Sequence, residues 1–202
     1  NHKKVESKIY SYWEKNKLFK PKKNKKAFSI VIPPPNVTGS LHMGHALNNS
    51  LQDVLIRYYR MNDHEALWQP GTDHAGIATQ ALVERSLKLK NINKEKIGRE
   101  KFIKEVWKWK NEYGGKITNQ LKKLGCSCDW SRNRFTMDKD LSNAVIKTFI
   151  QLYKKNLIYK DTKLVNWDTQ LETAISDLEV EQREVQSNLY YIKYKIAHEN
   201  SF

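Results

Sequence analysis

The chain has 202 residues, of which 39% are hydrophobic and 11% aromatic, so it is long enough for one substantial core or two small domains. Lys and Arg number 36 against 22 Asp and Glu, a net charge of +14, which makes polyanions such as nucleic acid or nucleotide phosphates natural partners. The apolar runs are shorter than the ~20 residues of a membrane-spanning helix, and the first residues lack the apolar core of a signal peptide. We therefore expect a cytoplasmic protein without a membrane partner.

The first half of the chain alternates predicted strands and helices. Residues 5–19 have apolar residues near helical spacing, and a basic linker follows them. An apolar run at 28–32, ended by three prolines, is typical of a buried parallel strand, and residues 46–60 after it predict a helix. Strand, loop and helix recur over residues 65–88. Two such units in series predict an α/β fold, the first half of a doubly wound parallel sheet.

The second half is predicted to be more helical. Residues 94–124 are strongly basic and have an apolar stripe that includes Phe102, Val106 and Trp109, which we interpret as core packing. We expect the pair Gly114-Gly115 to kink or divide this helix. Residues 138–155 predict another helix. Three short strands are expected at 164–167, 179–181 and 189–196.

Cys126 and Cys128 are the only two cysteines. They are separated by one residue, with no second pair and no nearby His at zinc-ligand spacing. We expect both to be reduced, structural thiols rather than metal ligands or a disulfide.

The loop between the first predicted strand and helix carries His42-Met43-Gly44-His45. Open α/β sheets bind ligands at the carboxyl ends of their strands, and the N–H groups at a helix start attract phosphates. Two imidazoles can add hydrogen bonds there, and Gly44 lets a flat base or a phosphate come close. The sequence therefore predicts a nucleotide site at this loop.

This motif resembles the HIGH signature of class I aminoacyl-tRNA synthetases and related nucleotidyltransferases. The resemblance implies a Rossmann-like nucleotide-binding domain with helical insertions. It assigns His42 and His45 catalytic roles in positioning ATP and stabilising charge at its α-phosphate. It also implies that Gly44 lies against the adenine, that Thr38 neighbours a phosphate, and that Mg²⁺ accompanies the ATP.

Longer stretches narrow the resemblance to one family. Pro33 to Leu47 is similar to the valyl-tRNA synthetase family almost letter for letter, and Trp68 to Gln80 resembles its second signature; residues 124–138 and 165–181 also match. The implied domains are an amino-terminal helix and basic linker, the first half of the catalytic domain with a helical insert, and the start of an inserted editing domain. Their expected bounds are 1–26, 27–186 with the insert at 91–135, and 187–202.

The same resemblance assigns an amino-acid site. Asp73 would hold the substrate ammonium, with a helix N-cap as its alternative role, and Pro33, Pro34 and Asn36 would line a small aliphatic pocket. The implied reaction is ATP-dependent activation of valine to valyl-adenylate and transfer to tRNA(Val) by a monomeric parent enzyme. Because the second half of the sheet and the editing pocket are missing here, this chain alone is expected to be inactive.

Asn166-Trp167-Asp168 departs from the Cys-Pro-x-Cys form with which some relatives bind zinc, so no structural zinc is expected. Two alternatives stay open. One is a sister synthetase for isoleucine or leucine. The other is a truncated, non-catalytic paralogue that binds tRNA or a protein through residues 94–124, which salt-sensitive RNA binding without ATP binding would favour.

Overall fold

The computed structural model describes residues 1–22 and 26–194. It divides into two compact units, Asn1–Tyr159 (unit 1) and Lys160–Phe202 (unit 2), which are treated separately below. Part of the predicted basic linker and the end of the predicted strand at 189–196 lie outside the described residues. Among the residues described, no helix is both long and apolar enough to cross a membrane.

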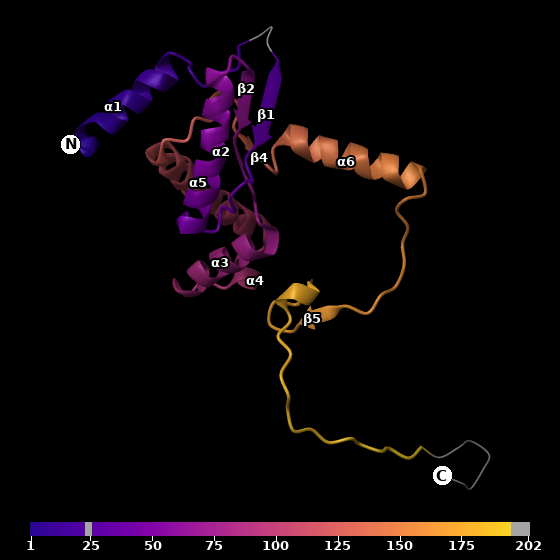
Figure 1. Cartoon of the computed structure of the whole chain (residues 1–202). Helices are drawn as coiled ribbons and strands as arrows, with labels where there is room; N and C mark the ends of the chain where they lie inside the picture. Colours follow the sequence, from indigo (N-terminus) through magenta and orange to yellow (C-terminus); the bar gives the residue numbers. More distant parts are fainter. Residues whose placement is uncertain (23–25, 195–202) are drawn as a thin grey trace. The chain divides into compact units, whose positions relative to one another are not determined.

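Unit 1 contains the predicted strand–helix–strand order (Figure 1). β1 (Ala27–Val31) and β2 (Glu65–Gln69) pair in parallel, with Ile30 opposite Trp68, and α2 (Met43–Met61) connects them. The Trp68 side chain is fully buried, as expected for an aromatic residue in the interior of a covered parallel sheet. This α/β arrangement is the one that the sequence predicts.

Three prolines interrupt the pairing just after β1. Pro33–Pro35 have no backbone N–H to donate. Pairing resumes where the Asp73 N–H donates to the Pro35 carbonyl (2.8 Å) and the Val37 N–H donates to the Asp73 carbonyl (2.9 Å). An isolated parallel bridge joins Asn36 to Asp73. The prolines thus open the ladder at the carboxyl end of β1 without separating the two segments beyond it.

A second parallel pair consists of β3 (Gly71–Thr72) and β4 (Arg134–Phe135). A Cβ at Gly71 would lie 3.1 Å from the Arg134 carbonyl oxygen, so glycine permits the close approach of these strands. Beside β4 lies a short 3₁₀ helix, η1 (Trp130–Arg132). The pairing brings Thr136, which follows β4, to the Thr72 carbonyl, with an N–H to oxygen distance of 3.2 Å.

The predicted helix at 94–124 is divided, but not where expected. α4 (Lys94–Ile97) and α5 (Arg99–Leu124) are separated by Gly98, which has a φ of 75°. This conformation favours glycine, which has no Cβ to clash. α5 continues without interruption through Gly114-Gly115, so the pair does not divide the helix.

Two clusters of buried side chains form the interior of unit 1. In the larger cluster the strands pack against α2 and α5, with Ile56, Trp68 and Ile117 fully buried. In the smaller one Phe102 of α5 packs with residues of α3 (Gly76–Lys88). The predicted apolar stripe on α5 is therefore core packing, as interpreted from the sequence.

α1 (His2–Lys15) packs through a different face from the one that its apolar spacing suggests. Val5, Ile9 and Tyr12 are exposed, whereas Tyr10 is buried. The Tyr10 hydroxyl donates to the Cys126 carbonyl (2.6 Å) and accepts from Trp130 Nε1 (2.6 Å). A hydroxyl able to satisfy two buried partners explains why this polar aromatic residue is the one that turns inward.

The two cysteines lie in the segment after α5. Both are free and buried, and burial raises the pKa of Cys126 to about 12. Burial also raises the pKa of Cys128. Thiols that stay protonated are weak nucleophiles, in agreement with the predicted reduced, structural role.

Beyond β4, α6 (Lys139–Lys154) coincides closely with its prediction, and it has no buried residue. In unit 2, β5 (Asn166–Asp168) and β6 (Thr173–Ile175) form an antiparallel hairpin. The Asp168 carboxylate accepts from the N–H groups of Gln170 (2.8 Å) and Leu171 (2.7 Å), so it stabilises the turn.

Two predicted strands of unit 2 are wrong where they can be compared. The strand expected at 179–181 is replaced by a 3₁₀ helix, η2 (Asp177–Glu179), because Glu179 accepts from the Ser176 N–H (2.9 Å) in a capping box. Residues 189–194 form no strand. Alternation of side chains alone does not make a strand when no neighbouring strand offers hydrogen bonds.

Candidate active site

His42 begins α2. Its backbone is extended (φ −122°, ψ 177°), its Nδ1 accepts from the Gly44 N–H at 3.1 Å, and its own N–H donates to His45 Nδ1 at 3.3 Å. The two histidines form a capping box, an arrangement usually made by a hydroxyl or carboxylate side chain. The motif therefore starts the helix with imidazole rings.

These two hydrogen bonds determine where each ring carries its proton. Since both Nδ1 atoms accept from backbone N–H groups, the neutral rings carry their protons on Nε2. The ring centroids of His42 and His45 are 4.0 Å apart. Neither Nε2 has a hydrogen-bond partner among residues 1–22 and 26–194. Two unused N–H donors consequently stand side by side at the start of α2.

Electrostatics keep one of these rings neutral. Burial, and then the neighbouring His42, lower the pKa of His45 from its ordinary value of 6.5. At pH 7 His45 is consequently uncharged, and its Nδ1 remains available to accept from the His42 N–H. The hydrogen bond from the His42 N–H to His45 Nδ1 is therefore maintained near neutral pH.

The histidines line an open hollow of about 710 Å³ at the carboxyl end of β1, which we call the histidine hollow. It brings together seven of the eight residues predicted for the site: Pro33, Pro34, Asn36, Thr38, His42, Gly44 and His45. Asn48 and Asn49 from the next turn of α2 also line it and were not predicted. Asn49 is buried, and its Nδ2 donates to the His45 carbonyl at 2.7 Å.

Gly44 is required by the ring that caps the helix. A Cβ at this position would lie 2.9 Å from His42 Cε1 and 3.1 Å from His42 Nδ1. Contacts under 3.0 Å essentially never occur, so a larger residue would displace the ring. Gly44 was predicted to allow close approach of a ligand. It also makes room for the His42 ring that caps the helix.

The loop between β1 and α2 is anchored to α5. Trp109 Nε1 donates to the Val37 carbonyl (2.9 Å), and the Leu41 N–H donates to Gln120 Oε1 (3.0 Å). Val37 is buried in the core, while Asn36 and Thr38 on either side of it line the hollow. α5 thus holds the loop through these two hydrogen bonds, and none of its residues lines the hollow.

Asp73 is held by a residue that the sequence does not point to. Thr136 Oγ1 donates to Asp73 Oδ1 at 2.9 Å and accepts from the His74 N–H at 2.9 Å. His74 Nδ1 lies 2.6 Å from the same hydroxyl and 3.3 Å from Asp73 Oδ1. Thr136 lies in the stretch 124–138 that matches the family, but no role was predicted for it; it is 63 positions away and approaches because β4 pairs with β3.

Asp73 does not cap α3, because Ala75 occupies the N-cap position there, so the alternative role is wrong. Its side chain is 34% exposed. It does not line the histidine hollow, but the bridge to Asn36 places its backbone next to the hollow's wall. A partly exposed carboxylate in this place can accept hydrogen bonds from a cation.

The donor set of the hollow suits an anion better than a metal. Its lining contains imidazoles, amides, hydroxyls and the start of a helix, but no carboxylate. The described part of the chain contains no group of three or more His, Cys, Asp or Glu side chains that could hold a metal ion. Phosphate oxygens fit these donors, and a divalent cation would have to bind chiefly to the phosphates.

Comparison with known families agrees with this geometry. Residues 8–198 match the family described as tRNA synthetases class I (I, L, M and V), and the chain belongs to this family. It is 72% identical over 201 residues to the valine–tRNA ligase of Pelagibacter ubique (strain HTCC1062), covering 100% of this chain and 23% of that protein. It is 61% identical over 196 residues to the valine–tRNA ligase of Caulobacter vibrioides, covering 96% of this chain and 22% of the relative.

This chain therefore spans about a quarter of the length of the curated relatives that it matches. Among solved structures it resembles the ternary complex of Agrobacterium radiobacter K84 agnB2 LeuRS with tRNA and LeuAMS, with a TM-score of 0.70 and 22% identity. That match covers 86% of this chain and 21% of the other. At this identity the likeness demonstrates the fold, which is the predicted α/β class.

Proposed function

We propose that this chain is the ATP- and amino-acid-binding part of a valine–tRNA ligase. The whole protein would activate valine with ATP and transfer it to tRNA(Val). The observation that carries the proposal is the pair of imidazoles at the start of α2, each with Nδ1 bound to backbone N–H and Nε2–H left to donate. Identity of 72% to a valine–tRNA ligase supports the choice of amino acid.

In the first step a carboxylate oxygen of valine attacks the α-phosphorus of ATP, and the bond to the bridging oxygen of the β-phosphate breaks. Pyrophosphate leaves with the electron pair of that bond, and valyl-adenylate remains. Both reactants are anionic, so the protein must orient them and stabilise charge on the phosphate oxygens. His42 and His45 would do so through Nε2–H, next to Thr38 and the N–H groups of α2.

Mg²⁺ would neutralise phosphate charge while bound to ATP, and we assign it no residue. Gly44 has no Cβ, and a Cβ there would occupy the space next to the His42 ring. This open space would let the adenine approach the start of α2. A cytoplasmic location, a monomeric parent enzyme and the domain boundaries stay predictions from the sequence.

Valine itself would lie between the proline-rich loop and Asp73. Pro33, Pro34 and Asn36 line the hollow and would form its aliphatic wall. The Asp73 carboxylate would accept hydrogen bonds from the ammonium group, in an orientation maintained by the Thr136 hydroxyl. Charge-assisted hydrogen bonds of this kind are about twice as strong as neutral ones.

The test is calorimetric binding of a non-hydrolysable valyl-adenylate analogue to this chain, compared with the isoleucyl analogue and with Asp73→Ala. We expect preferential binding of the valyl form and a large loss in the variant. A full-length protein containing this chain should also catalyse valine-dependent pyrophosphate exchange. If the full-length protein exchanges with isoleucine or leucine instead, or with no amino acid, the proposed function is wrong.

A further inference from the structure

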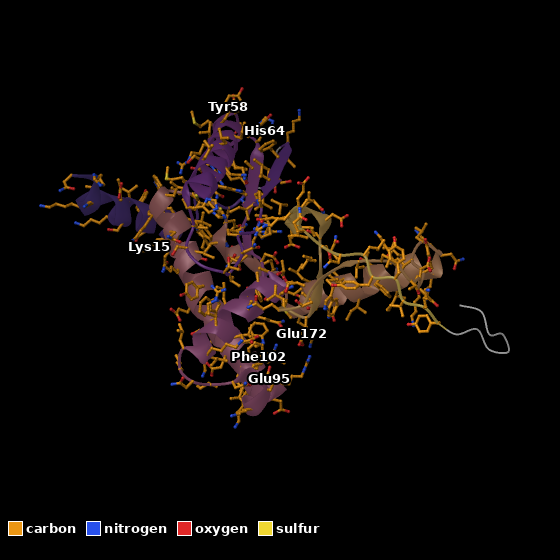
Figure 2. The ribbon with its side chains drawn as sticks, turned by 90° about the horizontal axis from the view of Figure 1, so that it is seen from below. Lys15, Tyr58, His64, Glu95, Phe102 and Glu172 are labelled. Atoms are coloured by element: carbon orange, nitrogen blue, oxygen red, sulfur yellow. The ribbon has the colours of Figure 1, made fainter. Side chains whose placement is uncertain are left out.

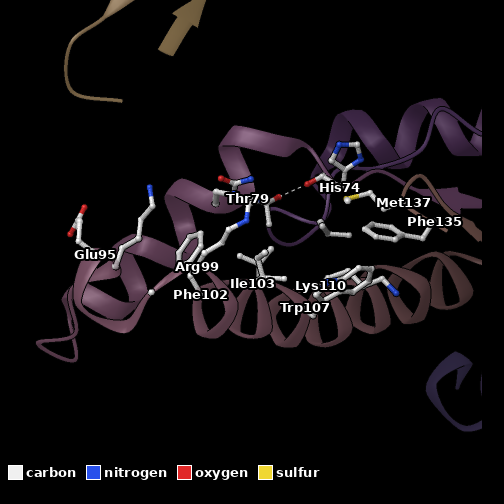
Figure 3. A pocket seen from close by; sticks show the side chains of 15 residues that line it. His74, Thr79, Glu95, Arg99, Phe102, Ile103, Trp107, Lys110, Phe135 and Met137 are labelled. Carbon is white, nitrogen blue, oxygen red and sulfur yellow. Dashed lines mark hydrogen bonds between the residues drawn. The ribbon is translucent and has the colours of Figure 1, made fainter. Parts of the chain in front are cut away.

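A second cavity of unit 1 is not used by the proposed reaction. It has a volume of about 570 Å³ and lies between α3, α4 and α5, beside β4; we call it the aromatic pocket. Glu95 and Phe102, which line it, lie at the end of unit 1 opposite to Tyr58 and His64 (Figure 2). Figure 3 shows side chains of α5 on one wall and those of Thr79 and His74 on the other.

The walls of the aromatic pocket are aromatic and aliphatic. Phe102 and Phe135 line it and are buried, whereas Trp107 is 42% exposed. The Trp107 and Phe135 rings meet edge to face, with centroids 5.9 Å apart. Packing against Phe135 fixes the Trp107 indole, while part of the indole surface stays open to the pocket.

Positive charge surrounds these walls. Lys110 Nζ lies 4.6 Å from the centroid of Phe135 and 5.7 Å from that of Trp107. Neither Lys110 nor Arg99 forms an ion pair within the described ranges 1–22 and 26–194. Lys94 contacts Glu84 at 3.5 Å, and Glu95 is the one acidic residue in the lining. The pocket therefore offers an exposed indole with the cation of Lys110 beside it, and a second cation, Arg99, farther along α5.

We propose that the aromatic pocket binds an unpaired stretch of an RNA strand, with one base against Trp107, the adjoining phosphate near Lys110 and a further phosphate near Arg99. Single-stranded nucleic acids are bound by aromatic side chains on which bases stack and by cations that follow the backbone. An apolar peptide would use the walls but leave both cations unpaired. An inorganic anion would use the cations but leave the walls exposed to water.

The position of the pocket fits such a ligand. His74 lines it and also contacts Thr136, which holds Asp73. Val37 lines it as well, between the two residues that face the histidine hollow. A nucleotide bound here would lie on the opposite side of the β1–α2 loop from the histidines. The choice of RNA over other single strands rests on the proposed function.

The experiment measures binding of a fluorescein-labelled six-nucleotide adenosine RNA to this chain by anisotropy over a range of salt concentrations. Trp107→Ala should weaken binding by about tenfold, the lower part of the range for loss of one stacked base, and Trp107→Phe should restore most of it. Lys110→Gln should lower the slope of log affinity against log salt by about 0.7, the value for one phosphate contact on a single strand. Circular dichroism of each variant checks that it is folded.

Lys123→Gln is the matched control, because Lys123 is an exposed lysine of the same helix that does not line the pocket. If it changes affinity and salt slope as much as Lys110→Gln does, the binding is general attraction to a basic surface and the proposal is wrong. Tight RNA binding that is indifferent to Trp107→Ala would overturn it too, as would equal affinity for an RNA duplex of the same charge.

The pyrophosphate exchange of the wild-type full-length protein involves no RNA, so it tests the proposed function separately. Exchange with no Trp107-dependent RNA binding would leave the proposed function standing and remove this inference. Trp107-dependent binding without exchange would do the reverse.

Discussion

The histidine hollow and the aromatic pocket are built in opposite ways. Every lining residue of the hollow comes from one continuous segment, 33–49, which follows a strand and begins a helix. The pocket combines residues from four elements (α3, α4, α5 and β4) and the segments between elements, and its aromatic wall depends on how α5 lies against β4. A motif therefore reveals the first site and gives no sign of the second. The predictions below test whether this difference also holds for function, from the largest expected effect to the smallest.

His42→Asn should separate the helix cap from the chemistry. Asparagine is a good N-cap residue, so the unfolding temperature should change little, but it cannot replace the Nε2–H donor. Loss of one donor to a developing oxyanion costs about 10² in rate, and we expect such a fall in pyrophosphate exchange by the full-length protein. His64→Asn is the control, since His64 lies outside the hollow. An equal loss in both variants would refute the assigned role.

Thr136→Val should raise the KM for valine about tenfold with a smaller change in kcat, because a hydrogen bond to a charged group contributes about 1.5–3 kcal/mol. Thr136→Ser keeps the hydroxyl and should behave like the wild type. The KM for ATP serves as the internal reference. If the two KM values rise together, Thr136 supports the fold rather than the orientation of Asp73.

Gly44→Ala should weaken ATP binding by a few-fold. The new Cβ would lie 2.9 Å from His42 Cε1, so the His42 ring would have to move. Titration of the folded protein with ATP measures the change. Gly115→Ala in α5 is the matched control, since a Cβ there meets nothing within 4 Å, and it should stabilise the helix by about 0.5–1 kcal/mol. Unchanged ATP affinity in Gly44→Ala would show that the ring can move without consequence.

The smallest effect concerns pH. The folded protein holds the pKa of His45 below its ordinary value of 6.5, so the unfolded chain binds more protons just beneath pH 6.5. Stability from this group is therefore complete above pH 6.5 and is lost as the pH falls through the lowered pKa. NMR titration should find this shift, and His42→Asn should reduce it, because His42 is its second cause after burial. A pKa above 6.5 would contradict this account.

Much of the fold could be predicted from the sequence, because the apolar run at 28–32 and the helical spacing at 46–60 are strong local signals. The predictions failed where the outcome depended on distant partners. The break in the long basic helix is set at Gly98 by its positive φ, and the inward face of α1 is set by Tyr10, whose partners lie more than a hundred residues away.

The candidate site divides in the same manner. Seven of its predicted residues meet in one hollow because they are neighbours along the chain. Thr136 could not be found, since a lone threonine after a two-residue strand carries no pattern of its own. Only the pairing of β4 with β3 shows that its hydroxyl reaches Asp73.

One helix, α5, lines the aromatic pocket and also holds the loop of the histidine hollow. The face of α5 that includes Trp107 forms a wall of the aromatic pocket, while Trp109 and Gln120 of the same helix hold the loop that carries the histidines. If occupancy of the pocket shifts α5 and changes the affinity for ATP by some factor, thermodynamic linkage requires that ATP change the affinity of the pocket by the same factor. Measuring either ligand's binding in the presence of the other would determine this coupling free energy.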